Sequence, residues 1–249
     1  NNNINCVLID NYEIDSKDIS MLDNCLPVIT FIDKSIYSKS DIIICTQPIN
    51  ITRRKGIKYL LGPKYAPVMQ KFIIKSKKNK LKNKILISFG AFDSQGITLN
   101  VIKAIQALFM SYSYNYSVLI VLTKDSPIIG KVKVLIKDYI NFELVLDSKN
   151  MQDIYRNCKI AIGAPGLSFL ERMASGLPSL LISQNIIHKD LIEEWVKLDC
   201  ALSCENSINL IEKKLSYLLS REDLLRNISL KGKNIVDGKG ASRIAKEII

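Results

Sequence analysis

The sequence has few residues of the kinds that build metal and redox centres, and it has no long apolar run. It contains one histidine, His188, and six cysteines, of which only Cys200 and Cys204 lie close together. These residues do not give the ligand set and spacing of a zinc site, so we expect no metal. No apolar run approaches the roughly 18 residues of a membrane span, so none is predicted.

Two common nucleotide-binding signatures are also missing. The sequence has neither G-x-G-x-x-G nor a Walker lysine loop. Their absence argues against hydride transfer and against ATP hydrolysis, and we expect no cofactor.

The start of the sequence lacks a cationic segment followed by an apolar stretch, which is typical of a secretory signal. Several cysteines lie in or beside apolar runs, where a free thiol behaves as a small hydrophobic group. Reduced thiols fit a cytoplasmic protein, which is the location that we expect. The first residues enter an apolar run almost at once, which predicts that the sequence begins partway through a domain.

Positive charge is in excess, with 35 Lys and Arg against 24 Asp and Glu and a formal net charge of +11. A cluster of lysines lies at Lys75–Lys84 (KSKKNKLKNK), where Leu81 is the one apolar residue. Blocks of like charge are usually solvated. The sequence also has no RNA-binding aromatic signature and no zinc-finger spacing. We therefore interpret residues 75–84 as a basic linker and expect no nucleic-acid partner.

Apolar runs before the linker predict part of an α/β domain over residues 1–74. Their Val and Ile content suits a parallel sheet that is covered on both faces. The expected strands are Cys6–Asp10, Pro27–Asp33 and Asp41–Cys45, with a short helix over Asp15–Leu22. Residues 59–72 are expected to form a loop, because Gly62, Pro63 and Pro67 interrupt the apolar run.

After the linker, expected strands and helices alternate regularly. The strands are expected at residues 84–90, 117–123, 142–147, 160–162, 179–183 and 201–204. The helices are expected at residues 98–110, 132–139, 151–157, 168–175, 188–198 and 208–219, and from Arg221 with a break at Asp237–Gly240. This alternation is typical of a doubly wound sheet. We expect one complete Rossmann-like domain with closing helices over residues 85–249.

Two glycine-containing loops follow strands of this domain. One is Ser88–Thr98 (SFGAFDSQGIT), and the other lies within Ile160–Pro178 (IAIGAPGLSFLERMASGLP). A helix N-terminus offers unpaired N–H groups and the positive end of a dipole to an anion. Loops at the carboxyl ends of parallel strands converge on one crevice. We therefore expect an anion site there, although a strand-to-helix connection without a ligand remains the alternative.

The loops supply seven candidate nucleotide-binding residues. They are Gly90, Ala91, Asp93, Gly166, Leu167, Ser168 and Glu171. Three of them have structural alternatives, which the residues leave open. Asp93 and Ser168 are also typical helix caps, and Glu171 is also favoured by the dipole in the first turn of a helix.

Five segments resemble, in order along the chain, the motifs of one family. DNYEID resembles DxYxLD, LLGPKYAPVMQKF resembles GxKYxxLRxEF, and SFGAFDSQGIT resembles SFGGxDxxxLT. APGLSFLERMASGLP resembles GxGSTxWERxxxGLP, and VDGKGASRI resembles DGxGAxRI. Together they extend from Asp10 to Ile244. The chain is similar to the UDP-sugar hydrolase of pseudaminic acid biosynthesis (UDP-2,4-diacetamido-2,4,6-trideoxy-β-L-altropyranose hydrolase) and to its spore-coat-polysaccharide relatives.

The resemblance implies a two-domain glycosyltransferase-B fold, similar to that of the peptidoglycan N-acetylglucosamine transferase. It implies hydrolysis of a UDP-linked diacetamido-trideoxy sugar to UDP and the free sugar, which is used for nonulosonic acid synthesis. UDP or the UDP-sugar is the expected partner, and its nucleotide would lie on the C-terminal domain. Glu171 would bind the ribose hydroxyls. Tyr65, Asp33 and Asn185 would contact the sugar side of the substrate.

The sequence departs from the family on the sugar side. It lacks the GxGHxxR loop whose histidine activates water in the family, so no residue is assigned the catalytic role. His188 lies in the C-terminal half and is not expected to replace that histidine. Lys34, Met69 and Ile186 replace residues that the family usually has. A changed sugar, lost catalysis, or a missing N-terminal segment or fused domain would each fit.

Three functions follow from the sequence. We favour an enzyme, a UDP-sugar hydrolase or its nucleotide-binding portion in bacterial surface-polysaccharide biosynthesis. The second is a glycosyltransferase of the same fold, which passes the sugar to an acceptor. The third is a non-catalytic module that binds a nucleotide sugar.

Overall fold

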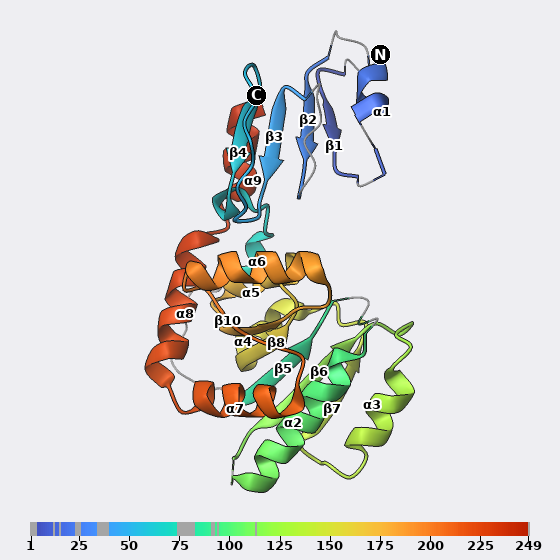
Figure 1. The fold of residues 1–249 in the computed structure, drawn as a ribbon, viewed down its shortest axis with the longest axis vertical. Coiled ribbons are helices and arrows are strands. Elements are labelled where there is room, and N and C mark those ends of the chain that lie inside the picture. Colours follow the sequence, from blue (N-terminus) through green and yellow to red (C-terminus); the bar gives the residue numbers. More distant parts are fainter. Residues whose placement is uncertain are drawn as a thin grey trace. The chain divides into compact units, whose positions relative to one another are not determined.

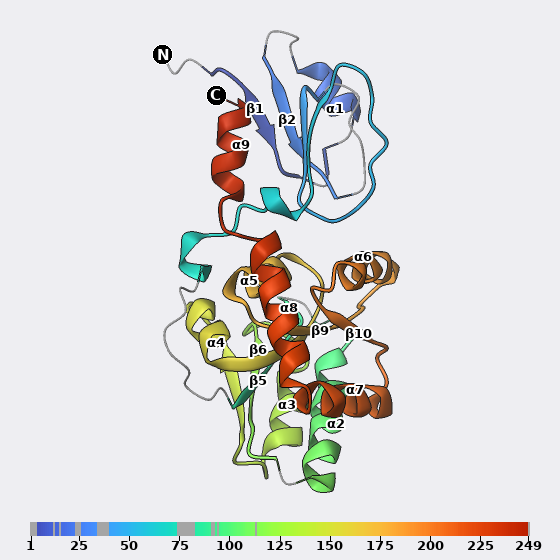
Figure 2. The ribbon, with the colours of Figure 1, turned by 90° about the vertical axis from the view of Figure 1, so that its left-hand side faces the viewer.

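The computed structural model describes residues 4–11, 13–14, 16–22, 26–33, 40–73, 83–90, 93, 95–112 and 114–248. The chain forms two compact units, which Figures 1 and 2 show in two views. The first consists of Asn1–Pro67 with Lys239–Ile249, and the second of Val68–Gly238. Most of the expected basic linker lies outside the described residues.

The first unit contains a parallel sheet with strand order β1-β2-β3-β4. Its elements are β1 (Val7–Ile9), α1 (Ser16–Met21), β2 (Val28–Phe31), β3 (Ile42–Cys45), β4 (Lys58–Leu61) and the 3-10 helix Pro63–Tyr65. The expected strands at β1, β2 and β3 and the helix between the first two are confirmed. The loop expected over residues 59–72 is wrong for residues 59–61, which belong to β4. Gly62, Pro63 and Pro67 lie after this strand and do not interrupt it.

Opposite faces of this sheet carry separate apolar clusters, because side chains alternate along a strand. On one face, Ile19 of α1 packs with Ile9 and Ile43. On the other, Ile244 of α9 (Gly240–Ile248) packs with Ile44 and other strand residues. The final helix of the described chain therefore covers a face of the first sheet. The domain limits expected from the sequence differ, since they grouped this helix with the C-terminal domain.

Two polar contacts and one close approach fix α9 on the first unit. Lys58 of β4 pairs with Glu247 at 2.6 Å. Arg243 Nη1 donates to the Lys64 carbonyl at 2.8 Å. A Cβ on Gly240 would overlap the Ala66 carbonyl, so the start of α9 needs a residue without a side chain.

The second unit contains a six-stranded parallel sheet in the order β10-β9-β8-β5-β6-β7. Its strands are β5 (Lys84–Ser88), β6 (Ser117–Leu122), β7 (Phe142–Leu146), β8 (Cys158–Gly163), β9 (Ser179–Ile182) and β10 (Leu202–Cys204). Two βαβ halves meet where β5 lies beside β8, which is the switch point of a doubly wound sheet. The expected Rossmann-like alternation is confirmed.

Seven helices and one short 3-10 turn are described in this unit. They are the turn Gln70–Phe72, α2 (Ile97–Ser111), α3 (Ile129–Ile136), α4 (Met151–Asn157), α5 (Leu167–Ser175), α6 (Ile186–Lys197), α7 (Ile208–Leu219) and α8 (Glu222–Ile235). Branched apolar residues of β5, β6 and β8 form one core with α2 and α7. Helices α5 and α6 meet through an edge-to-face contact of Phe169 with Trp195, whose ring centroids are 5.3 Å apart.

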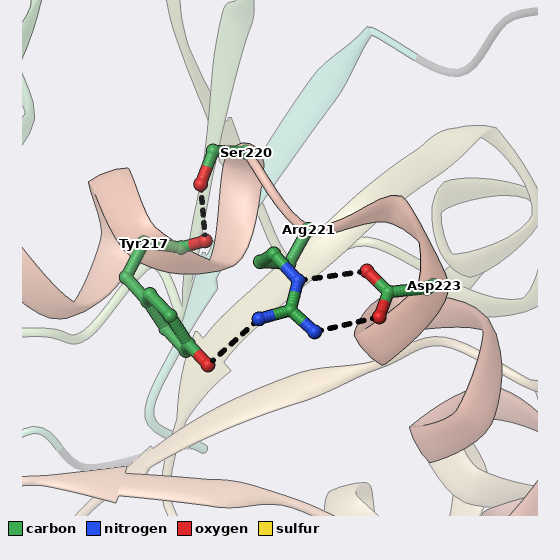
Figure 3. A network of polar contacts seen from close by, with 4 residues as sticks. All are labelled: Tyr217, Ser220, Arg221 and Asp223. Carbon is green, nitrogen blue, oxygen red and sulfur yellow. Dashed lines mark hydrogen bonds and ion pairs between the residues drawn. The ribbon is translucent and has the colours of Figure 1, made fainter.

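An exposed polar network joins α7 to α8 (Figure 3). Arg221 donates from Nε and Nη2 to the two carboxylate oxygens of Asp223, at 2.9 and 2.7 Å. Its Nη1 donates to the Tyr217 hydroxyl at 3.3 Å, and the Ser220 hydroxyl donates to the Tyr217 carbonyl at 2.8 Å. The hydrogen bonds from Arg221 lower the pKa of Asp223 to about 2. Arg221 thus contacts Tyr217 of α7 and Asp223 in the first turn of α8.

Within the described part of the chain, every helix is too short or too polar to cross a membrane. The same residues form no cluster of three or more potential metal ligands. The described cysteines, which are Cys6, Cys45, Cys158, Cys200 and Cys204, are free thiols.

The packing of α9 generates the first prediction. Ile244 is 7% exposed against the first sheet, so Ile244→Ala removes buried methyl groups and leaves a cavity. We expect the free energy of unfolding of the first unit to fall by about 2–4 kcal/mol. The control Lys246→Ala, at an exposed position of the same helix, should change it by less than about 0.5 kcal/mol. Urea unfolding measures both, and equal effects of the two variants would contradict this packing.

Candidate functional site

A crevice of about 370 Å³ lies at the carboxyl ends of the second sheet. Its walls come from the ends of β5, β6 and β7 and from α4 and α5. The lining residues are Ser88, Gly90, Val121, Leu122, Thr123, Asp147, Ser148, Met151, Tyr155, Ser168 and Glu171. Hydroxyl and carboxyl groups thus share the crevice with an apolar strip, which consists of Val121, Leu122 and Met151. Its position beside the β5–β8 switch point is where doubly wound sheets bind ligands.

At the end of β8, the backbone of Gly163 lies very close to the end of β5. A Cβ on Gly163 would overlap the Ser88 carbonyl and the Arg172 side chain, so glycine is required there. Gly166 precedes α5, and no described side chain caps this end of the helix. The first N–H groups of α5 and its dipole therefore remain available to a negatively charged group.

Glu171 is held within this crevice by Tyr155. The Tyr155 hydroxyl donates to Glu171 Oε2 at 3.3 Å. The Tyr155 ring packs on Phe72, with centroids 5.7 Å apart, which fixes its position. Burial raises the pKa of Glu171, and the Tyr155 hydrogen bond and the charges of Lys71 and Arg172 oppose this rise. The result is a half-buried carboxylate with a fixed orientation, suited to accept hydrogen bonds from neighbouring hydroxyls.

Three residues expected to bind a nucleotide meet in the crevice. Gly90, from the β5 loop, has a φ of +86°, which a side chain would strain. Ser168 and Glu171 come from the first turns of α5. Gly166 precedes the same helix, and Leu167, its first residue, is 73% exposed. Ala91 lies outside the described residues.

Asp93, a candidate nucleotide-binding residue, caps helix α2 in the structure. Its Oδ1 accepts the Ile97 N–H at 2.9 Å, and its Oδ2 accepts the Thr98 N–H at 2.7 Å. The side chain is 1% exposed and closes the N-terminus of α2. Both carboxylate oxygens are occupied within the fold, so the geometry does not support the predicted contact of Asp93 with a nucleotide.

Asn185 and His188 form the start of α6, after β9. Asn185 Oδ1 accepts the His188 N–H at 2.8 Å, and His188 Nδ1 accepts the Gln184 N–H at 3.4 Å. Burial lowers the pKa of His188. His188 is not among the residues that line the crevice. The predicted substrate contact of Asn185 stays a prediction.

Tyr65 and Asp33 belong to the first unit. Tyr65 ends the 3-10 helix Pro63–Tyr65 and packs against the cluster that contains Ile244. Asp33 follows β2, and its charge contributes to the raised pKa of Cys45, which results mainly from burial. Their predicted contacts with a sugar stay predictions.

Sequence reasoning named only Gly90, Ser168 and Glu171 among the lining residues, and Tyr155 and Asp147 are two ionisable residues that it missed. Tyr155 lies in α4, a helix that the sequence predicted without a functional residue. Asp147 follows β7 with a φ of +48°, and its Oδ1 accepts the Lys124 N–H at 3.0 Å. The available signal was Asp147 as the last residue of the strand expected over residues 142–147, since side chains at such ends lie at the edge where ligands bind.

Comparison with known proteins extends these observations. No family model matches the chain. A curated relative, an uncharacterized protein of Methanocaldococcus jannaschii, is 24% identical over 148 residues, which is 56% of this chain. The chain spans about 30% of that relative's length.

Solved structures are similar over much more of the chain. MnaA of S. aureus, in a co-structure with UDP, aligns over 98% of this chain and 72% of its own, with a TM-score of 0.71 and 13% identity. The chain has a glycosyltransferase-B-like fold. MurG of Acinetobacter baumannii aligns over 94% of this chain and 68% of its own, with a TM-score of 0.66 and 11% identity. The calicheamicin glycosyltransferase CalG4 covers 85% of this chain and 52% of its own, with a TM-score of 0.57 and 14% identity.

The environment of Glu171 generates the second prediction. A carboxyl group with a raised pKa in the folded state lowers stability at pH values at which it is ionised. Glu171→Gln removes this charge and keeps an acceptor for the Tyr155 hydroxyl. We expect the variant to be more stable than the wild type at about pH 7, and the difference to vanish below about pH 4, where the carboxyl is protonated in both states. Thermal unfolding across this pH range measures the difference, and a variant less stable at every pH would contradict it.

Proposed function

We propose that the crevice binds the UDP moiety of a nucleotide sugar. The observation that carries the proposal is the open N-terminus of α5 beside Glu171, at the switch point of the second sheet. A diphosphate needs N–H donors and positive potential, which this helix end supplies. A ribose needs an acceptor for two neighbouring hydroxyls, which Glu171 supplies.

The remaining walls suit the other parts of a nucleotide. The diphosphate would lie between the Gly90 loop and Ser168. The ribose would meet Glu171, oriented by Tyr155. The planar base would cover the apolar strip that includes Val121 and Met151. Binding sites for small molecules commonly combine such a strip with a few placed polar groups.

The comparisons support this assignment at the level of substrate class. The co-structure of MnaA contains UDP, and the alignment with it extends over nearly the whole of this chain. The five motifs that resemble the pseudaminic acid pathway hydrolase include the segment of Gly166, Ser168 and Glu171. We therefore propose a cytoplasmic UDP-sugar hydrolase, or its nucleotide-binding portion, that acts on a diacetamido-trideoxy sugar in surface-polysaccharide biosynthesis.

Sugar transfer to an acceptor is the second candidate. It is supported by the likeness to CalG4, a glycosyltransferase of the same fold. In either reaction, Tyr65, Asp33 and Asn185 would contact the sugar. The two reactions differ in the group that attacks the anomeric carbon, which is water in hydrolysis and an acceptor hydroxyl in transfer.

Nucleotide binding is tested by titration calorimetry with UDP. We expect wild-type protein to bind UDP, and Glu171→Ala to weaken binding by about tenfold or more, because hydrogen bonds to a charged group contribute about 1.5–3 kcal/mol. Glu193→Ala, which removes an exposed carboxylate from α6, is the matched control and should leave the affinity unchanged. No heat with up to millimolar UDP would overturn the nucleotide assignment.

Turnover is tested by UDP release from a UDP-sugar. A base must lie within hydrogen-bond reach of the attacking water. The sequence lacks the family's histidine loop, and His188 Nδ1 accepts a backbone N–H at the start of α6. We expect these 249 residues to release UDP slowly or not at all, and His188→Ala to cause no change.

Two other outcomes of this assay carry information. An increase of UDP release on addition of acceptor sugars would favour transfer over hydrolysis. Rapid release that His188→Ala abolishes would show that His188 is the base and would contradict the expectation.

A further inference from the structure

Arg172 is a fully buried cation that joins the two glycine loops of the crevice. Its Nη1 donates to the carbonyl of Ser88, the last residue of β5, at 3.3 Å. Its Nη2 donates to the carbonyl of Ala164, directly after β8, at 2.6 Å. The guanidinium carbon lies 5.6 Å from the centre of the Phe169 ring, on the same helix. One side chain thus connects the ends of the two strands that form the switch point.

The hydrogen bonds of Arg172 leave one of its donors without an acceptor, and its charge without an ion pair, among the described residues. Its buried Nε has no acceptor among the described residues. Its two acceptors are neutral carbonyl groups, and no described carboxylate lies within ion-pair distance of it. Burial lowers the pKa of Arg172 to about 10, while the charge of Glu171 opposes this effect, so the group stays cationic at neutral pH. An unpaired buried charge is unfavourable, and a bound anion would offset it.

Arg172 contacts the wall of the crevice that would face the diphosphate. Ser88, whose carbonyl accepts from Arg172, lines the crevice. Ala164, the other acceptor, lies in the turn that leads to the open N-terminus of α5. The dipole of α5 and the guanidinium therefore contribute positive potential to the same part of the crevice.

We propose that Arg172 is an electrostatic positioning residue, which stabilises the diphosphate of a bound nucleotide from behind the crevice wall while it holds the Ser88 and Ala164 carbonyls in place. The inference rests on the proposed function, because it assumes that a nucleotide diphosphate occupies this crevice. Arg172 would not touch the ligand. Its effect would act through the field of its charge, and so would depend on the charge of the ligand.

The test compares uridine, UMP and UDP, which share a nucleoside and differ in negative charge. Calorimetry is carried out on wild type, Arg172→Lys and Arg172→Met. Met fills a similar volume without charge. It also removes the donors to the Ser88 and Ala164 carbonyls, so the test rests on the comparison between ligands of different charge. We expect Arg172→Met to weaken UDP binding by about ten- to a hundredfold, UMP binding less, and uridine binding less than about twofold. Arg172→Lys should retain more of the UDP affinity than Arg172→Met.

The outcomes separate the two proposals. Loss of affinity by the same factor for all three ligands in Arg172→Met would show a purely structural role and overturn this inference, while UDP binding by the wild type would uphold the proposed function. Failure of the wild type to bind UDP would overturn both. Circular dichroism and thermal unfolding identify any variant that fails to fold.

Arginine labelling with ¹⁵N gives a readout that needs no folded variant. The Nε–H signal of Arg172 in the wild type should shift on addition of UDP and stay in place on addition of uridine. Equal shifts with the two ligands would contradict an effect of ligand charge.

Discussion

The pairing of β5 with β8 is the constraint on which the proposed site depends. Ser88 lies opposite Gly163 in this parallel register, and a side chain at Gly163 would overlap both the Ser88 carbonyl and Arg172. Close contact of the two strand ends brings their loops to one edge of the sheet. This pairing therefore places the Gly90 turn, which follows β5, beside the open end of α5 and Glu171, which follow β8. Catalytic or binding groups on such loops are positioned by the sheet and not by the loops themselves.

The site combines groups that are unfavourable for folding with a core that tolerates them. Glu171 is half-buried with a raised pKa, and Arg172 is buried with a lowered one. Each shift means that the fold disfavours the charged form that we assign to function. Perturbed groups of this kind are concentrated at functional sites. The apolar core formed by β5, β6 and β8 with α2 and α7 supplies the stability that offsets them.

The sequence predicted the alternation of strands and helices because apolar periodicity is a local property. Sequence reasoning failed where the place of a helix or side chain depends on contacts with residues distant in the chain. Nothing in the pattern of α9 indicates which sheet it covers, and the domain limits expected from the sequence include this helix in the C-terminal domain. Asp93 shows the same limit at a single residue, since a carboxylate after a strand is suited both to bind a ligand and to cap a helix. Tyr155 was missed because its contact with Glu171 joins α4 to α5 and has no signature within either helix.

The position of α9 has a consequence for the order of folding during synthesis. The first unit is assembled from residues on both sides of the second, so the second unit is an insertion within it. A ribosome releases the whole insertion before it releases the helix that covers one face of the β1–β4 sheet. That face stays exposed while the Rossmann-like unit already has all its strands. We therefore expect the inserted unit to complete its folding first during synthesis. Until α9 is released, a chaperone that binds apolar surface would bind the uncovered face of the β1–β4 sheet.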